Sequence, residues 1–263
     1  MRLKNALLLL FYLPRVLRLF SNWPEYLTNY ALRKRRPATY TLRNGFRLAD
    51  GTGTLAGTIA VVFVRHEYGR LDPDYRTIVD IGANMGCFTV FAAKECPQAR
   101  ILSFEPEQNN FQYLTQNIQT NALENRITAF RCAVAREGGT REIAIDASPL
   151  HTLLITPGGR KVQKVQCTTI RDIMRESGLE RIDFMKMNCE GAEYEILGDC
   201  SQEDLARIRR LRIEYHNFDT GQRNGKALAA LLEKSGFQIE RYTTYVVHQG
   251  IFSEAGFIWA ARA

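Results

Sequence analysis

Apolar runs of strand length alternate with segments of helical periodicity from residue 77 to the end of the chain. The helical segments carry their apolar residues on one face, as Phe111, Leu114 and Ile118 do within residues 109–120. The pattern predicts strands at residues 77–80, 101–105, 127–132, 182–187, 208–214, 237–242 and 257–261, and helices at residues 88–94, 109–120, 170–176, 192–197 and 226–235. Such alternation is typical of an α/β fold, a largely parallel sheet covered on both faces. Ligands of these sheets bind at the carboxyl ends of the strands.

Three further segments lie outside this alternation or interrupt it. Residues 39–48 alternate around Asn44-Gly45, which is typical of a hairpin, and residues 58–64 (TIAVVFV) predict a short buried strand. Residues 140–168 predict a β excursion. We therefore expect three parts: a basic helical segment at 1–36, a β or lid extension at 37–76, and the main domain at 77–263.

The N-terminal segment combines apolar and basic residues. Its apolar run at 6–14 has nine residues, about half of the ~20 that span a bilayer. An apolar stripe at helical spacing follows, and Pro24 is expected to kink or restart the helix. The stripe comprises Val16, Leu19, Phe20, Trp23, Tyr26 and Leu27. Either this amphipathic segment lies on an anionic bilayer surface, or it packs on the main domain with its basic face in water.

Charge is distributed unevenly along the 263 residues. Residues 1–50 hold ten Lys or Arg against two Asp or Glu, whereas residues 51–263 hold 25 against 26. A nucleic-acid-binding body would carry its own basic surplus, so we expect no nucleic-acid partner. The six cysteines form no C-x-x-C pair, which favours the reducing cytoplasm. If residues 1–36 lie on a bilayer, we expect that contact to be peripheral and at the inner face of the membrane.

The most informative stretch is residues 78–86 (IVDIGANMG), where an apolar strand runs into D-x-G-x-x-x-G and then a helix. The glycines permit a tight turn and close backbone approach to a cofactor. A second strand ends at Glu105, 19 residues beyond Gly86, where a carboxylate can accept both hydroxyls of a ribose.

The residues of this loop favour one adenosine cofactor over another. Dinucleotide sites use G-x-G-x-x-G to meet a pyrophosphate, but Ala83 and Asn84 stand where the middle glycine is needed. Asp80 at the strand end is expected to face the cleft, where it would repel phosphate and attract an ammonium or sulfonium. Charge therefore favours S-adenosylmethionine over NAD.

Six ordered motifs between about residues 77 and 217 resemble the FkbM family of S-adenosylmethionine-dependent methyltransferases. They are VDIGANMGCFT (79–89), SFEPEQNNFQYLTQNI (103–118), AVA (133–135), TTIRDI (168–173), IDFMKMNCEGAEYEIL (182–197) and RLRIEYHN (210–217). The resemblance implies a Rossmann-like class I methyltransferase fold, with a seven-stranded mostly parallel sheet and helices on both faces. It also implies O-methylation of a hydroxyl on a sugar, a glycan or a natural product.

The loop and the resemblance together assign the cofactor site. Its expected residues are Asp80, Gly82, Ala83, Asn84, Gly86, Glu105, Pro106, Ala133 and Glu190. One departure concerns the motif after the fourth strand: the family commonly has Lys-Ile-Asp-x-Glu-Gly, whereas residues 186–191 read KMNCEG. Asn188 keeps an oxygen acceptor but carries no charge, so it cannot serve as a base.

Candidate catalytic residues follow the fourth and fifth predicted strands. His216 is the expected general base, because its unperturbed pKa lies near neutrality, and Glu214, two residues away, faces the same side of an extended segment. Glu214 is expected to orient His216 or bind acceptor hydroxyls, while Lys186 and Asn188 hold the acceptor or the cofactor. Glu190, Glu214, His216 and Asn188 offer metal ligands, but the motif fixes no geometry and we expect no metal.

The acceptor is left open by the sequence. His66, Tyr68 and His151 lie on segments that are expected to border the cleft. Two alternatives to the enzyme are a catalytically silent, membrane-associated S-adenosylmethionine-binding module, favoured by Asn188, and an NAD(P)-dependent sugar-modifying oxidoreductase. The oxidoreductase would need a third loop glycine and a Tyr-x-x-x-Lys pair, and residues 77–263 contain neither.

Overall fold

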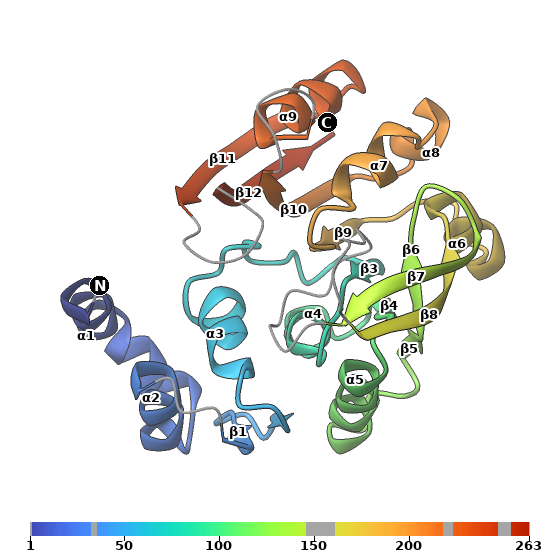
Figure 1. Ribbon diagram of the computed structural model, residues 1–263. Coiled ribbons are helices and arrows are strands. Elements are labelled where there is room, and N and C mark those ends of the chain that lie inside the picture. Colours follow the sequence, from blue (N-terminus) through green and yellow to red (C-terminus); the bar gives the residue numbers. More distant parts are fainter. Residues whose placement is uncertain (1, 33–35, 146–160, 218–222, 247–253, 263) are drawn as a thin grey trace.

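A computed structural model describes residues 2–32, 36–145, 161–217, 223–246 and 254–262 (Figure 1). Its centre is a seven-stranded sheet in the order β11-β12-β10-β9-β3-β4-β5. These strands are β3 (Thr77–Ile81), β4 (Arg100–Phe104), β5 (Ile127–Phe130), β9 (Phe184–Met187), β10 (Arg210–Asn217), β11 (Gln238–Val246) and β12 (Glu254–Ala261). The predicted α/β class and the seven-stranded sheet are confirmed.

The strand directions place the candidate residues at one edge of this sheet. Strands β5, β4, β3, β9 and β10 run parallel, and β12 runs antiparallel to both β10 and β11. Because the parallel strands end at the same edge, the segments that follow β3, β4 and β9 converge there. The strand β10 continues through Asn217, so Glu214 and His216 lie within it rather than after it.

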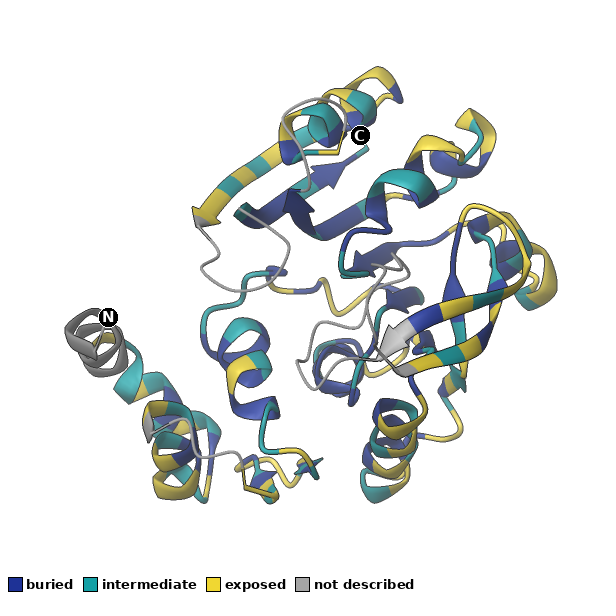
Figure 2. Ribbon diagram, viewed as in Figure 1, coloured by how far each residue is buried: buried dark blue, intermediate teal, exposed yellow. Residues whose placement is uncertain are grey.

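Alternating side chains of each strand pack into two cores, one on each face. Ile78 packs with α4 (Cys87–Glu95), α5 (Gln108–Thr120) and the N-terminal elements. Its neighbour Val79 packs on the opposite face. The helices of that face are α6 (Ile170–Ser177), α7 (Glu193–Gly198), α8 (Gln202–Ala206) and α9 (Gly225–Lys234). The central strands are accordingly dark blue in Figure 2, buried from both sides.

The predicted β excursion forms a separate three-stranded sheet beside the main one (Figure 1). Its strands are β6 (Cys132–Val134), β7 (Gly139–Ile145) and β8 (Lys161–Thr168), in the order β6-β8-β7. The predicted strand at 127–132 is therefore divided: β5 belongs to the main sheet and β6 to the small one. Residues 146–160 of the excursion, including His151, lie outside the described residues.

The strand predicted at residues 58–64 is wrong, because this segment is helical. Helix α3 (Leu55–Ile59) continues into a π-helical turn, η1 (Ala60–Val64). Ile59, Val62 and Phe63 are buried in the core against α4. A helix that buries most of its circumference has a continuous apolar sequence, and periodicity cannot distinguish such a run from a strand.

The N-terminal segment packs on the rest of the chain. Helix α1 (Arg2–Leu19) ends before Pro24, and α2 restarts at Trp23 (Trp23–Leu32), followed by the hairpin of β1 (Ala38–Thr41) and β2 (Arg47–Asp50). Val16, Phe20 and Tyr26 of the predicted stripe are buried in the same core as α3 and α4, and Leu19, Trp23 and Leu27 are partly buried against it. The expected hairpin is thus confirmed. No helix within the described ranges has the length and hydropathy needed to cross a membrane.

Candidate functional site

The glycine loop turns from β3 into α4 in a conformation that its glycines make possible. Gly82 and Gly86 have φ of 73° and 84°. The backbone N–H groups of Gly82 and Ala83 both donate to the carbonyl oxygen of Phe104, at 3.0 and 2.9 Å. A Cβ atom added to Gly82 would lie 1.8 Å from the backbone oxygen of Asn188. Only glycine fits here, because two loops meet at backbone contact distance.

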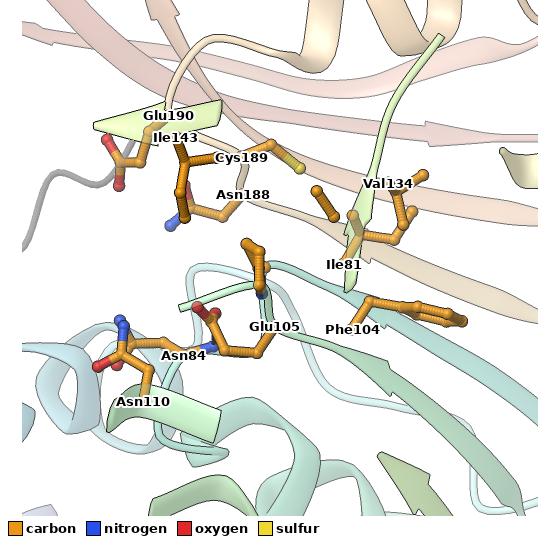
Figure 3. Close-up of a pocket in the computed structure, with 13 residues that line it drawn as sticks. Ile81, Asn84, Phe104, Glu105, Asn110, Val134, Ile143, Asn188, Cys189 and Glu190 are labelled. Atoms are coloured by element: carbon orange, nitrogen blue, oxygen red, sulfur yellow. Dashed lines mark hydrogen bonds between the residues drawn. The ribbon is translucent and has the colours of Figure 1, made fainter. Parts of the chain in front are cut away.

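A first pocket of about 630 Å³ opens at the carboxyl ends of β3, β4 and β9. Figure 3 shows Asn84, Glu105 and Asn110 on one wall and Asn188, Cys189 and Glu190 on the opposite wall. Phe104 and Val134 add apolar surface at one end of the pocket, and Ile143 adds it beside Glu190. The pocket therefore combines an apolar surface for an aromatic base with carboxylates and amides for polar groups.

Glu105 is fixed at the end of β4 by backbone donors. Its carboxylate accepts hydrogen bonds from the backbone N–H groups of Asn84 (2.7 Å) and Glu107 (2.9 Å). Burial raises the pKa of Glu105 to about 7, because desolvation opposes the charged form more than these donors favour it. Glu105 thus lines the first pocket at the end of β4, and its role as the carboxylate that accepts ribose hydroxyls stays a prediction.

Asp80 does not line the pocket, which corrects the expectation that it faces the cleft. Its side chain is fully buried, accepts a hydrogen bond from Thr89 Oγ1 at 2.7 Å, and lies 3.0 Å from Lys186 Nζ. Lys186 Nζ also donates to the backbone oxygens of Ile81 and Gly82, at 3.3 and 2.7 Å. Asp80 therefore acts on the loop through Lys186, and the carboxylates at the pocket wall are Glu105 and Glu190.

A second pocket of about 1050 Å³ adjoins the first. Gly82, Asn84, Asn188 and Glu190 line both pockets. The remaining lining residues come from α3 and η1, from the glycine loop and α4, and from polar residues of the sheet: Thr54, Gly57, Thr58, Val61, Val62, Tyr68, Ala83, Phe88, Lys186 and Glu214. A molecule bound in the first pocket would thus lie next to a molecule bound in the second.

Glu214 is held by three donors from three parts of the chain. Its carboxylate accepts hydrogen bonds from Tyr68 Oη (2.7 Å), Asn188 Nδ2 (2.9 Å) and Tyr245 Oη (2.7 Å). Asn188 Oδ1 is buried and has no hydrogen-bond partner within the described ranges. Asn188 therefore orients Glu214 with its amide nitrogen and leaves its oxygen for a bound molecule.

His216 lies behind Glu190 and lines neither pocket among the described residues. Its Nε2 is 3.3 Å from Glu190 Oε2 and its Nδ1 is 3.5 Å from Glu193 Oε1. Although burial opposes its charge, these carboxylates raise the pKa of His216 to about 10. The ring consequently holds its proton at neutral pH, which does not suit the expected general base.

Glu190 has an unusual backbone and an unusual pKa. Its φ is 51°, a left-handed conformation that costs free energy in any residue but glycine and is concentrated at functional sites. Burial raises its pKa to about 7, and the neighbouring carboxylates of Glu214 and Glu193 act in the same direction against His216 and Lys186. Glu190 is the one carboxylate common to both pocket walls in the described part of the chain.

Most of the residues predicted for the cofactor lie at the first pocket. Its wall includes Gly82, Asn84, Glu105, Pro106, Ala133 and Glu190, whereas Ala83 lines the second pocket. Gly86, like Asp80, lines neither; it turns the chain into α4 beneath Leu114. Sequence reasoning assigned no role to Asn110 or Ile143, which line the first pocket from α5 and β7.

The candidates for the acceptor site lie in different places. Tyr68 lines the second pocket, but His66 packs beside Phe91 with 5.6 Å between ring centroids. Burial lowers the pKa of His66 to about 4. Within the described residues, no group of three or more His, Cys, Asp or Glu side chains is arranged to hold a metal ion.

The first pocket suits an adenosine cofactor that carries a positive sulfonium and ammonium. Glu105 would accept the ribose hydroxyls, and the apolar side formed with Ile143 would cover the base. The carboxylate of Glu190 and the unpartnered oxygen of Asn188 offer acceptors for the positive groups.

Comparisons with known proteins agree with this geometry. Residues 80–239 match the family described as the methyltransferase FkbM domain. The methyltransferase sdnD of Sordaria araneosa is 28% identical over 214 residues, covering 68% of this chain and 81% of its own length. The 31-O-demethyl-FK506 methyltransferase FkbM of Streptomyces tacrolimicus is 26% identical over 193 residues, covering 62% of this chain and 72% of its own length.

A solved structure shares the fold. The methyltransferase FkbM of Methylobacillus flagellatus superposes with a TM-score of 0.50 at 16% sequence identity. The superposition covers 76% of this chain and 47% of the solved one, so the chain spans about half the length of that protein. Because the family match covers residues 80–239, which include the glycine loop and every residue that lines the first pocket, the chain belongs to the FkbM family of methyltransferases, whose cofactor is S-adenosyl-L-methionine.

Proposed function

We propose that the protein transfers a methyl group from S-adenosyl-L-methionine to a hydroxyl oxygen of a sugar, a glycan or a natural product. The observation that carries this proposal is the junction of the two pockets at Gly82, Asn84, Asn188 and Glu190. When bound, the cofactor supplies an electrophilic methyl group on a positive sulfur. A hydroxyl in the second pocket would approach that methyl across the shared wall, as an in-line displacement requires.

Glu190 replaces His216 as the proposed general base. An alcohol must lose its proton as its oxygen attacks, and a base works best when its pKa lies near the working pH. The pKa of Glu190 is about 7, and its carboxylate lies on the wall that both pockets share. Glu190 would accept the hydroxyl proton as the acceptor oxygen bonds to the methyl carbon; the bound cofactor would supply that methyl group, and its carbon–sulfur bond would break to leave S-adenosylhomocysteine.

His216 then acts through Glu190 rather than on the acceptor. Its ring lies between the carboxylates of Glu190 and Glu193, at 3.3 and 3.5 Å. A protonated imidazole there fixes the position of Glu190 and moderates the rise in its pKa. Glu214, held by its three donors, would bind a second hydroxyl of the acceptor and orient the first.

Methyl transfer to a panel of hydroxyl acceptors tests the proposal. The full chain is incubated with labelled S-adenosyl-L-methionine and neutral glycosides, oligosaccharides and polyketide alcohols, and methyl ethers are identified by mass spectrometry. Glu190→Gln should lower kcat about 100-fold or more, a larger factor than its loss of cofactor affinity, and exposed Glu203→Gln is the matched control. Tight cofactor binding with no methylated product would overturn the proposed enzyme activity and favour the catalytically silent binding module. The oxidoreductase alternative is already contradicted by membership of a methyltransferase family.

We also propose a cytoplasmic location with peripheral contact between residues 1–36 and an anionic membrane surface. The surplus of basic residues in this segment supports the contact. The buried stripe at Val16, Phe20 and Tyr26 means that attraction would be electrostatic and not by insertion of these side chains. Full-length protein should sediment with phosphatidylserine vesicles at low salt and be released by about 0.5 M salt, where the Debye length is only a few ångströms. Equal recovery with neutral vesicles would contradict the proposal.

A further inference from the structure

The second pocket has two chemically different sides. Val61 and Val62 of η1 and Phe88 of α4 form an apolar side together with the ring of Tyr68. Lys186, Asn188, Glu190 and Glu214 form the other side. A molecule that fits between them has an apolar face and a hydroxyl-bearing edge.

The positive charge on this wall is already committed. Within the described residues, Lys186 is the one cationic side chain that lines the second pocket. Its Nζ lies 3.0 Å from Asp80 Oδ1 in an ion pair and donates hydrogen bonds to the backbone oxygens of Ile81 and Gly82, at 3.3 and 2.7 Å. Lys186 is also 96% buried. The charge of Lys186 is therefore paired with Asp80, and two backbone oxygens hold its ammonium group in place.

The surrounding charges are negative in sum. Asp80, Glu190, Glu193 and Glu214 are four carboxylates, against the two cations Lys186 and His216. Glu214 receives three hydrogen bonds from neutral donors, so its charge is stabilised without a cation. A phosphate or carboxylate on the acceptor would meet like charge in a partly desolvated site, with no free cation on the pocket wall described here.

We propose that the second pocket selects an uncharged, hydroxyl-bearing ring with one apolar face and rejects acceptors that carry a phosphate or carboxylate on that ring. This inference rests on the proposed transfer of a methyl group to a hydroxyl, and it further specifies that the acceptor ring is uncharged. Sugars activated by a phosphate at the reacting ring and uronic acids are excluded; a neutral glycoside ring or a macrocyclic alcohol is accepted. Electrostatic repulsion sets the specificity, since shape alone does not distinguish a hydroxymethyl group from a carboxylate.

Binding of matched probes tests the proposal without knowledge of the natural acceptor. The full chain is saturated with S-adenosylhomocysteine, and the methyl groups of Val61 and Val62 are followed by NMR as ligand is added. The probes are phenyl β-D-glucopyranoside and phenyl β-D-glucuronide, which differ by one carboxylate. The neutral glucoside should shift both valine signals with a Kd at least about tenfold below that of the glucuronide.

A charge variant separates electrostatics from fit. Glu214→Gln keeps the size and hydrogen-bonding oxygen of the side chain but removes one negative charge, so it should narrow the ratio between the two probes. The exposed Glu203→Gln should leave the ratio unchanged. Equal or tighter binding of the glucuronide would overturn the proposal, and so would an absence of valine shifts with both probes. Neutral selectivity without methyl transfer to any hydroxyl would instead contradict the proposed function and leave this inference standing.

Discussion

Replacing Lys186 by Met tests whether a buried ion pair holds the glycine loop in place. The Met side chain retains the length of the lysine stem but removes the ammonium group. In the native protein Nζ lies 3.0 Å from Asp80 Oδ1, and the two side chains are 5% and 0% exposed. After the substitution Asp80 would keep the hydroxyl of Thr89, at 2.7 Å, and lose the cation beside it.

The burial of both partners sets the magnitude. Exposed ion pairs contribute about 0–1 kcal/mol, whereas removal of one partner from a buried pair costs about 3–5 kcal/mol, because the other charge is left in a medium of low polarity. For a chain of this size each kcal/mol lowers Tm by roughly 2–4 °C. Lys186→Met should therefore lower Tm by about 6–20 °C.

Thermal and urea unfolding followed by circular dichroism measure the effect. Asp80→Asn combined with Lys186→Met should recover much of the lost stability, because no buried charge then lacks a partner. Lys234→Met, at an exposed position of α9, is the matched control and should change the free energy of unfolding by less than about 0.5 kcal/mol. Calorimetry should also show weaker cofactor binding in Lys186→Met, because the lysine holds two loop carbonyl oxygens.

Two results would refute this reasoning. If Lys186→Met unfolds within about 1 kcal/mol of the native protein, the pair does not carry the cost expected of buried charges. If the double variant is no more stable than Lys186→Met alone, the loss does not come from the unpaired carboxylate of Asp80.

Three further predictions concern other parts of the molecule. Gly82→Ala should weaken S-adenosyl-L-methionine binding at least about tenfold by calorimetry, because its Cβ would overlap a backbone oxygen; Gly198→Ala, with open space around it, should bind normally. The raised pKa of His216, about 10, means that its ion pairs stabilise the protein fully below about pH 6.5 and are lost as pH rises through 10. The native protein should therefore lose Tm between pH 6.5 and 10, and His216→Asn should not show this loss. If the variant shows the same dependence of Tm on pH, other groups cause it. Phe20→Ala should cost about 3–5 kcal/mol, because Phe20 is fully buried, whereas Phe11→Ala, 77% exposed, should cost almost nothing in urea unfolding; similar losses would contradict the packing of the N-terminal segment.

The order of strands and helices in the main domain could be predicted because each element shows its own periodicity. The run at 170–176, for example, has its apolar residues on one face and is helix α6. The run at 58–64 could not be assigned in this way. Its helix buries most of its surface against α4, so that no polar face marks the helical period.

The sequence predicted where the site residues lie along the chain better than it predicted their protonation states. Glu105 and the glycine loop could be placed from the sequence because a strand that enters a tight turn fixes the backbone locally. The role of His216 could not be predicted. Its pKa depends on Glu190 and Glu193, which come from a different strand end and helix and surround the ring only in the folded chain.

The sequence by itself determined the α/β class, the glycine loop and the resemblance of its motifs to a family that uses S-adenosylmethionine. These depend on local backbone rules and on the order of elements along the chain. Only the tertiary structure decided that Asp80 neutralises Lys186 instead of facing the cofactor, that Glu190 lies between two pockets, and that the wall of the second pocket offers no free cation among the described residues. The physical reason is that charge and pKa are set by burial and by neighbours distant in sequence, and sequence spacing does not encode either.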